Sequence, residues 1–428
     1  MKKKTIGLFI FILLIATAFP VIGSLNDKKI TIMVESSSTQ SFIRTDWNEI
    51  QKKPLNETIV LAPNSTYFTT TAFNSYKTYR ESNGQTIKCE SLETLANPDA
   101  DQIREFLKKN YSDGNQRYLL ILGDENLIPC KYCYDYAYNN QIFKVHSDYY
   151  YGDLEGDWDN DNDGKFGEFR DDKIDILNPE FLVGRLPGST LTEIDTIFNR
   201  TIAFEKEKGS WKRNMLLTAG SVFVPGDSSL VMNFIDWFRT PRCYNITTIS
   251  DDWILKKPDI ILNGTSFRKT WSEGKFGLVY VICHGSKTGL YYYHIPFDYP
   301  EIFDIRDVQY LNPDYPAVFV SLACMSNQQY NGQTLGKELI LNHSVAVIAS
   351  STVTFTGRFP LPISGIWAET FFPHLYLRKA LNLGMAIQIT KEMYYRLFVH
   401  WRTPKGGKPL QMNMIAFILY GDPLVKQC

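Results

Sequence analysis

Two uninterrupted apolar runs, each ending in a reactive side chain, constrain the fold more than any other part of this sequence. The first extends from Val279 to Gly285 and carries His284 near its end, and the second extends from Ala317 to Cys324. Near-continuous apolar runs of this length are typical of strands buried on both faces of a parallel sheet. In open α/β sheets the chemistry lies just beyond the carboxyl ends of such strands. If the two strands are neighbours, His284 and Cys324 emerge together at one edge of the sheet.

A cysteine beside a histidine is the pair that nucleophilic acyl transfer requires. The thiolate attacks a carbonyl carbon, and a nearby imidazole lowers the pKa of the thiol and transfers the proton. Either residue alone also fits a purely structural role, because free cysteines are among the most buried residues. The shared position of His284 and Cys324 at strand ends favours catalysis. Cys283 should face the opposite side of its strand, since side chains alternate, and is not expected to be the nucleophile.

These H-G and A-C contexts resemble those of the gingipain-like family of caspase-type cysteine peptidases. Further short motifs follow the family's order: Y-L-L-I-L-G-D-E-N-L-I-P at 118–129, S-D-Y-Y-Y-G-D at 147–153, P-E-F-L-V-G-R-L-P at 179–187, A-V-I-A-S-S at 346–351 and Y-G-D-P at 420–423. Before residue 118 the resemblance is faint. It implies an α/β fold of two adjoining caspase-like subdomains, each a mostly parallel sheet flanked by helices, and the activity of a cysteine endopeptidase.

The resemblance also implies roles for individual residues. A glutamate in the P-E-x-x-x-G-R motif orients the family's catalytic histidine, which assigns that role to Glu180; the alternative is a surface acid at the start of a strand. The backbone N–H groups of Gly285 and Cys324 are expected to bind the oxyanion. Arginine-selective members carry an acid in the substrate pocket just after the G-R motif. This chain has Leu191 and Thr192 near that position, so the sequence does not predict selectivity for a basic residue.

An acidic loop between residues 149 and 172 predicts a calcium site. Its clustered carboxylates belong to Asp157, Asp159, Asp161, Asp163 and Glu168. The segment 159–164 matches the first half of an EF-hand loop, in which alternate oxygens face one ion and a glycine makes the turn. The twelfth position is Arg170 rather than glutamate, so the EF-hand is not intact. Because five clustered carboxylates repel one another, the sequence favours a structural Ca²⁺ over a solvated loop without an ion. The resemblance, whose members include calcium binders, agrees.

The N-terminus predicts a secretory signal and a secreted or cell-surface protein. Lys2, Lys3 and Lys4 precede an apolar run at 6–19, and small residues before Ser24 offer a cleavage site. The run is shorter than the ~20 residues of a membrane span, which favours a cleaved signal over an uncleaved anchor, and no second span follows. Seven N-x-S/T sequons suit an exported glycoprotein, at Asn56, Asn64, Asn110, Asn199, Asn245, Asn263 and Asn342.

The length of 428 residues predicts more than one domain. We expect a signal peptide at 1–23, an N-terminal α/β subdomain with the acidic loop at 24–209, and a C-terminal catalytic caspase-like subdomain at 210–428. The boundary follows the helix-stop signal Lys208-Gly209. With 45 basic and 46 acidic side chains, no charge excess points to nucleic acid. Polypeptides are the expected substrates, no transmembrane domain is expected after signal cleavage, and the oligomeric state is left open.

Local patterns also predict individual strands and helices. Asn97 as N-cap and Pro98 in the first turn predict the start of one helix, and Thr190 with Glu193 forms a capping box that predicts another. Further strands are expected at 29–35, 58–62, 118–122, 181–183, 214–219 and 344–349, and further helices at 229–238, 368–377 and 384–397.

Two other classes of function fit parts of the sequence. One is a catalytically silent, calcium-stabilised surface binding protein on the same scaffold, against which the intact His284 and Cys324 argue. The other is a metal site that uses His284 with cysteines. Cys130 and Cys133 form a C-x-x-C, but no second such pair accompanies it. That absence argues against zinc and favours a local disulfide or two plain thiols.

Overall fold

The structure is a computed structural model of the chain. It describes residues 30–32, 43–45, 55–138, 141–222, 226–236, 243–252, 256–294, 298–328, 332–354, 376, 381–399 and 404–427. The predicted signal peptide and most of the helix expected at 368–377 lie outside these residues. The chain divides into two compact units, Met1–Leu55 with Arg358–Leu361 and Asn56–Gly357 with Pro362–Cys428. In the first unit, β1 (Ile30–Ile32) pairs antiparallel with β2 (Ile43–Thr45).

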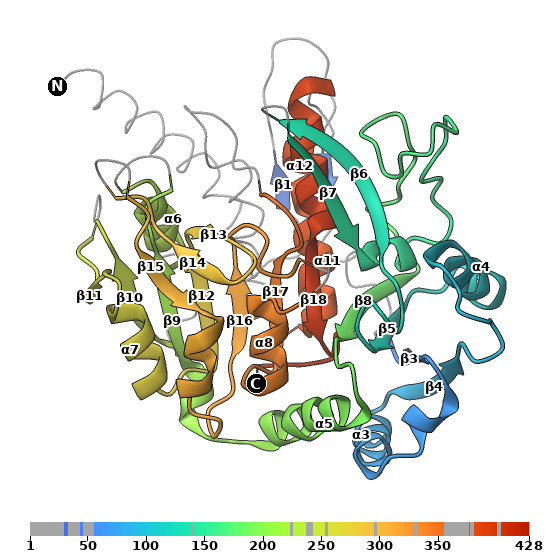
Figure 1. Ribbon diagram of the computed structural model, residues 1–428, viewed down its shortest axis with the longest axis horizontal. Helices are drawn as coiled ribbons and strands as arrows, with labels where there is room; N and C mark the ends of the chain where they lie inside the picture. Colours follow the sequence, from blue (N-terminus) through green and yellow to red (C-terminus); the bar gives the residue numbers. More distant parts are fainter. Residues whose placement is uncertain are drawn as a thin grey trace. The chain divides into compact units, whose positions relative to one another are not determined.

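The second unit is built on an eleven-stranded, mostly parallel sheet (Figure 1). The strand order is β11-β10-β9-β12-β16-β17-β18-β8-β5-β3-β4, and only the β17–β18 pair is antiparallel. This arrangement confirms the predicted α/β class. The strands are β3 (Glu57–Ala62), β4 (Thr86–Ser91), β5 (Arg117–Leu122), β8 (Phe181–Leu186), β9 (Asn214–Ala219), β10 (Asn245–Ser250), β11 (Ile260–Ile261), β12 (Leu278–Ile282), β16 (Val318–Ser321), β17 (Ala346–Ser350) and β18 (Phe417–Gly421).

Helices cover both faces of the sheet, and each face has its own apolar cluster. The first cluster unites β-strand side chains with those of α3 (Thr71–Ser82), α5 (Leu191–Lys206), α7 (Ser266–Glu273) and α8 (Leu335–Asn342). The second unites the opposite side chains of strands such as β3 and β5 with those of α4 (Ala100–Tyr111), α11 (Leu383–Tyr394) and α12 (Pro404–Ala416). Because successive strand residues point to opposite faces, an apolar run such as β5 can supply both clusters. Among the described residues, no helix has the length and hydropathy needed to cross a membrane.

Shorter elements lie at the edges of the sheet. A hairpin is formed by β6 (Lys131–Tyr138) and β7 (Gln141–Ser147), and a small three-stranded sheet by β13 (His284–Gly285), β14 (Gly289–Tyr291) and β15 (Glu301–Asp304). The remaining elements are α6 (Asp227–Phe234), the 3₁₀ helices η1 (Ser65–Phe68), η2 (Asp148–Tyr151), η3 (Ser210–Arg213) and η5 (Ile305–Tyr310), and the π-helix η7 (Tyr395–Val399).

Most local predictions are confirmed, with two corrections. The capping box of Thr190 and Glu193 begins α5 as expected. The predicted N-cap of α4 is wrong: Asp99 takes the place of Asn97, because its carboxylate accepts the N–H of Gln102 while the Gln102 side chain bonds back to Asp99. The strands β12 and β16, which were expected to reach His284 and Cys324, are also shorter than predicted. After Ile282 the chain leaves the large sheet to form β13, which pairs with β14.

The C-terminal strand β18 joins the two halves of the sheet. It lies between β17 and β8 in Figure 1, with the strands from residues before 209 on one side and those from later residues on the other. The two expected sheets are therefore continuous with each other. The boundary after residue 209 itself stays a prediction.

A buried ion network holds the end of β18 against the helices of the first half. Arg80 of α3 lies 2.6 Å from Asp422 and 2.6 Å from Glu205 of α5, and all three side chains are almost fully buried. Burial raises the pKa of Glu205, although the charge of Arg80 acts in the opposite direction. The guanidinium is therefore the counter-charge that two buried carboxylates share.

Arg80→Met should lower the free energy of unfolding by about 3–5 kcal/mol, because it leaves two buried carboxylates unpaired. Urea unfolding measures the loss. The matched control is Lys77→Met, which breaks the exposed pair with Glu81 on the same helix and should cost at most ~0.5 kcal/mol. Equal losses in the two variants would contradict the structural role of the network.

Candidate active site

Two neighbouring strands lead to the chain segments that carry His284 and Cys324. β12 and β16 pair in parallel from Leu278 with Val318 to Val281 with Ser321, a constant offset of 40 residues. Continued three positions beyond the last paired residues, the same offset leads to His284 and Cys324, although His284 and Gly285 themselves pair with β14. The prediction of the site required these two strands to be neighbours, and the structure shows that they are.

A close backbone contact confirms that the two chain segments meet there. A Cβ atom built on Gly285 would lie 2.5 Å from the carbonyl oxygen of Cys324 and 3.0 Å from its nitrogen. Only glycine leaves room for this approach. The residues just before the pair, Cys283 and Ala323, are buried in the first apolar cluster, whereas His284 and Cys324 are partly exposed. Cys283 thus faces away from the site, as predicted, and burial raises the pKa of its thiol.

A backbone carbonyl orients the imidazole of His284. Its Nε2 lies 2.6 Å from the carbonyl oxygen of Val222, in the turn after β9. A carbonyl oxygen only accepts hydrogen bonds, so we assign the proton of the neutral ring to Nε2, which leaves Nδ1 as the acceptor. The ring of Tyr299 packs edge-on against the imidazole, with ring centroids 5.2 Å apart. The sequence analysis had missed both contacts.

The sulfur of Cys324 has a polar neighbour from the loop after β17. The Thr354 N–H donates toward Sγ at 3.3 Å, and the Thr354 hydroxyl lies 3.4 Å from the same atom. Donors that point at a sulfur favour its thiolate form. Thr354 could have been noticed in the sequence, because it follows the carboxyl end of the next strand in the sheet. Only the strand order shows that this end lies beside Cys324.

Glu180, the predicted orienting acid, lies elsewhere in the sheet. It precedes β8, and β16, β17 and β18 separate β8 from β12, a distance of about 19 Å at the usual strand spacing. Its carboxylate accepts the N–H of Leu154 at 2.7 Å. The structure thus brings the backbone of Gly285, the residue after His284, against that of Cys324, and it does not place Glu180 beside them.

Comparisons with known proteins identify the family to which the chain belongs. The sequence matches Peptidase family C25 over residues 51–427. The chain belongs to this family of cysteine peptidases. No curated protein matches the sequence.

Two solved structures show the same fold as this C25 peptidase. The crystal structure of the Arg specific cysteine proteinase gingipain R has a TM-score of 0.61 and 17% sequence identity, and the match covers 88% of this chain and 78% of gingipain R. A structure described as "Structure of Protease" has a TM-score of 0.66 and 15% sequence identity, and the match covers 88% of this chain and 79% of the other. The predicted resemblance and fold are both confirmed. At these identities the structural likeness establishes the fold alone.

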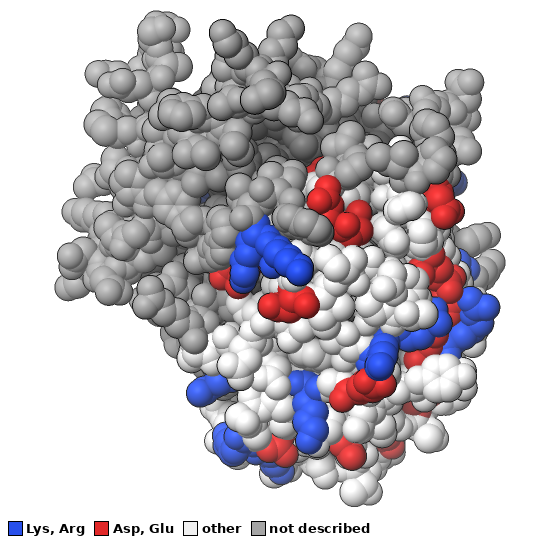
Figure 2. Space-filling model, turned by 90° about the vertical axis from the view of Figure 1, so that its left-hand side faces the viewer, with Lys and Arg blue, Asp and Glu red and all other residues white. Residues whose placement is uncertain are grey.

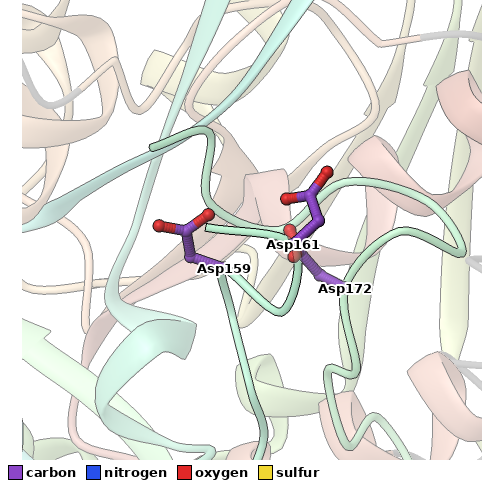
Figure 3. Close-up of side chains that lie close together, drawn as sticks. All are labelled: Asp159, Asp161 and Asp172. Carbon is purple, nitrogen blue, oxygen red and sulfur yellow. The ribbon is translucent and has the colours of Figure 1, made fainter. Parts of the chain in front are cut away.

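The acidic loop of this C25 peptidase gathers carboxylates into two overlapping clusters. Oxygens of Asp159, Asp161 and Asp172 lie within 4.8 Å of one another (Figure 3). Those of Asp161, Asp163 and Glu168 lie equally close together. Four of the five predicted ligands are therefore in clusters that could hold a metal ion. Within the described part of the chain, no such group of three ligands includes His284 or a cysteine. Cys130 and Cys133 are both buried.

Asp172 is the ligand candidate that the sequence analysis missed, and Asp157 is the one that the structure leaves out. The carboxylate of Asp172 accepts the N–H groups of Asn160 and Glu168, which holds it inside the loop. Burial raises the pKa of Asp172, and the charge of Asp161 raises it further. A cation would relieve that repulsion, so the donor chemistry fits a hard divalent ion. Asp157 instead pairs through its backbone with Lys173.

Gly285→Ala should separate the two chain segments that carry the pair, because its Cβ would overlap the backbone of Cys324. We expect a loss of about 1–3 kcal/mol in the free energy of unfolding and a slower reaction of Cys324 with iodoacetamide. Gly264→Ala is the matched control, since its Cβ would meet nothing closer than 3.4 Å. If alkylation and stability match those of the wild type in Gly285→Ala, the close contact does not exist in solution.

Proposed function

We propose that this chain is a secreted cysteine endopeptidase that cleaves polypeptides through a Cys324–His284 dyad and a thioester intermediate. The observation that carries the proposal is the parallel register of β12 and β16, supported by the close approach of Gly285 to Cys324. Membership of a cysteine peptidase family supports the reaction class. The proposal also includes a signal peptide that ends at residue 23, export of the protein, and a boundary between two subdomains after residue 209.

The reaction follows from the positions of the two side chains. The Cys324 thiolate attacks the peptide carbonyl carbon, and the new C–S bond forms as the scissile C–N bond breaks. The imidazolium of His284 gives its proton to the leaving amine, so that a thioester remains on the enzyme. Neutral His284 then takes a proton from water as the water oxygen attacks the thioester; the C–S bond breaks, the acid is released, and the thiolate of Cys324 and the imidazolium of His284 are regenerated. Because Nε2 is bound to the Val222 carbonyl, Nδ1 is the nitrogen that transfers the proton.

The surroundings of the dyad assist these steps. The Thr354 N–H stabilises the thiolate before the attack. The N–H groups of Gly285 and Cys324 bind the oxyanion of the tetrahedral intermediate in this proposal. The orienting role of Glu180 remains a prediction from the resemblance, and the Val222 carbonyl provides orientation within the site.

Gingipain R is described as Arg specific, and we do not extend that preference to this chain. Glu193, the first acid after the G-R motif, caps α5 by accepting the N–H groups of Ser189 and Thr190. Its carboxylate is therefore committed to the helix start. On the face drawn in Figure 2, acidic and basic side chains of the described residues are intermixed, and neither sign forms a continuous patch.

We also propose that the acidic loop binds a structural Ca²⁺ ion. Asp161 belongs to both carboxylate clusters, and Asp159, Asp163, Glu168 and Asp172 complete them. Carboxylate oxygens are the ligands that calcium prefers, and the ion would supply positive charge that offsets the repulsion within the loop. Its role in this proposal is to stabilise the loop rather than to take part in hydrolysis.

Cys324→Ala should reduce peptide hydrolysis at least about a thousandfold and leave the melting temperature close to that of the wild type, because it removes the nucleophile and little volume. Cleavage of a peptide library and labelling by a thiol-directed peptide probe are the measurements. Cys89→Ala, at an exposed free thiol, is the control and should retain both. A wild-type protein with neither cleavage nor labelling would favour the silent, calcium-stabilised surface binding protein instead.

Removal of calcium should lower the melting temperature, because an ion that binds only the folded state stabilises it by ~2.7 kcal/mol at a hundred times its dissociation constant. Differential scanning calorimetry with and without a chelator measures the change. Asp161→Asn, which weakens both clusters, should remove most of the chelator's effect. Asp171→Asn is a control in the same loop outside the clusters. If the chelator does not change the melting temperature of the wild type, the calcium site is excluded.

A further inference from the structure

A tyrosine pair beside the catalytic imidazole has no role in the mechanism described so far. Tyr299 is 51% exposed, although it packs on two other rings. One neighbour is His284, at 5.2 Å between centroids with an interplanar angle of 80°, and the other is Tyr293, at 5.8 Å and 61°. A large aromatic side chain that stays half exposed at an active site is a ready contact surface for a substrate.

The backbone around these rings is held by several hydrogen bonds. The Tyr293 N–H donates to the Ser221 carbonyl at 2.7 Å, one residue before the Val222 carbonyl that orients His284. His294 and Asp298 exchange two backbone hydrogen bonds, of 2.8 and 2.9 Å. The hydrogen bonds between His294 and Asp298 hold residues 294 and 298 side by side, and the rings of Tyr293 and Tyr299 next to them are in contact. The surface is therefore formed before substrate binds, which reduces the entropy lost on binding.

The chemistry of peptide hydrolysis identifies which part of a substrate reaches this surface. In the proposed reaction, His284 protonates the nitrogen of the scissile bond, so its ring lies beside that atom. The residue that follows the scissile bond is attached to the same nitrogen through its Cα. The side chain of that substrate residue is therefore the part of the substrate nearest to the ring of Tyr299, which packs directly on the imidazole.

We propose that Tyr299 and Tyr293 form the subsite for the residue immediately after the cleaved bond, and that they favour an aromatic or large aliphatic side chain there. The inference rests on the proposed peptidase function and extends it to substrate choice. Aromatic side chains gain by edge-to-face packing on tyrosine rings. An acidic side chain is disfavoured, because the Asp298 carboxylate accepts the backbone N–H of Tyr299 and so brings a negative charge to this part of the chain.

Cleavage of a mixed peptide library by the full-length protein, with the products identified by mass spectrometry, tests this preference without a known substrate. Among cleaved bonds, phenylalanine, tyrosine and leucine should follow the cut about three to ten times more often than glycine, after correction for their abundance, and aspartate should be depleted. Tyr299→Ala should abolish that enrichment while the preference before the cut persists, and Tyr299→Phe should retain it. Tyr310→Ala, which removes another exposed tyrosine from η5, is the matched control.

The outcomes separate this inference from the proposal beneath it. Wild-type enrichment that survives Tyr299→Ala, or no enrichment in an active wild type, would overturn the subsite alone. If Tyr299 acts only by orienting His284, Tyr299→Ala will slow all cleavages equally with unaltered preferences, which also overturns it. Failure of the wild type to cleave any peptide would refute the peptidase function, and the subsite with it.

Discussion

The parallel pairing of β12 with β16 is the contact on which the proposed chemistry depends. Because their offset is constant, the residues that follow the two strands emerge at the same level, and a histidine and a cysteine occupy those positions. Gly285 then allows the two backbones to touch. A shift of one residue in this register would turn one of the two side chains to the opposite face of the sheet.

Other parts of the fold hold in place the edge of the sheet at which β12 and β16 end. β18 comes from the C-terminus and connects the two halves of the sheet, and the buried network of Arg80, Glu205 and Asp422 holds its end in place. On the catalytic side, the turn after β9 supplies the Val222 carbonyl for His284, and the loop after β17 supplies Thr354 for Cys324. The loops after β9 and β17, the outer neighbours of β12 and β16, thus each contribute polar contacts to the pair.

Sequence reasoning succeeded where the signal was local or periodic. Apolar runs predicted the buried strands, and the capping box of Thr190 predicted the start of α5. It was incomplete where partners come from distant segments. Asp172 joins the acidic clusters through a loop that folds back on itself, beyond the reach of a twelve-residue motif. Glu180 matches a family motif, but a motif carries no information about how many strands separate two residues.

The sequence by itself determined that this chain forms an α/β fold with His284 and Cys324 near strand ends. The reason is that the side-chain periodicity and apolar character of a strand depend only on consecutive residues. Tertiary structure alone decided which groups surround that pair. Val222 and Tyr299 carry no local pattern that distinguishes them, and the place of Thr354 after β17 becomes informative only once the strand order is known. They reach the site because the order of strands in the sheet is set by the burial of many side chains together, which no short segment encodes.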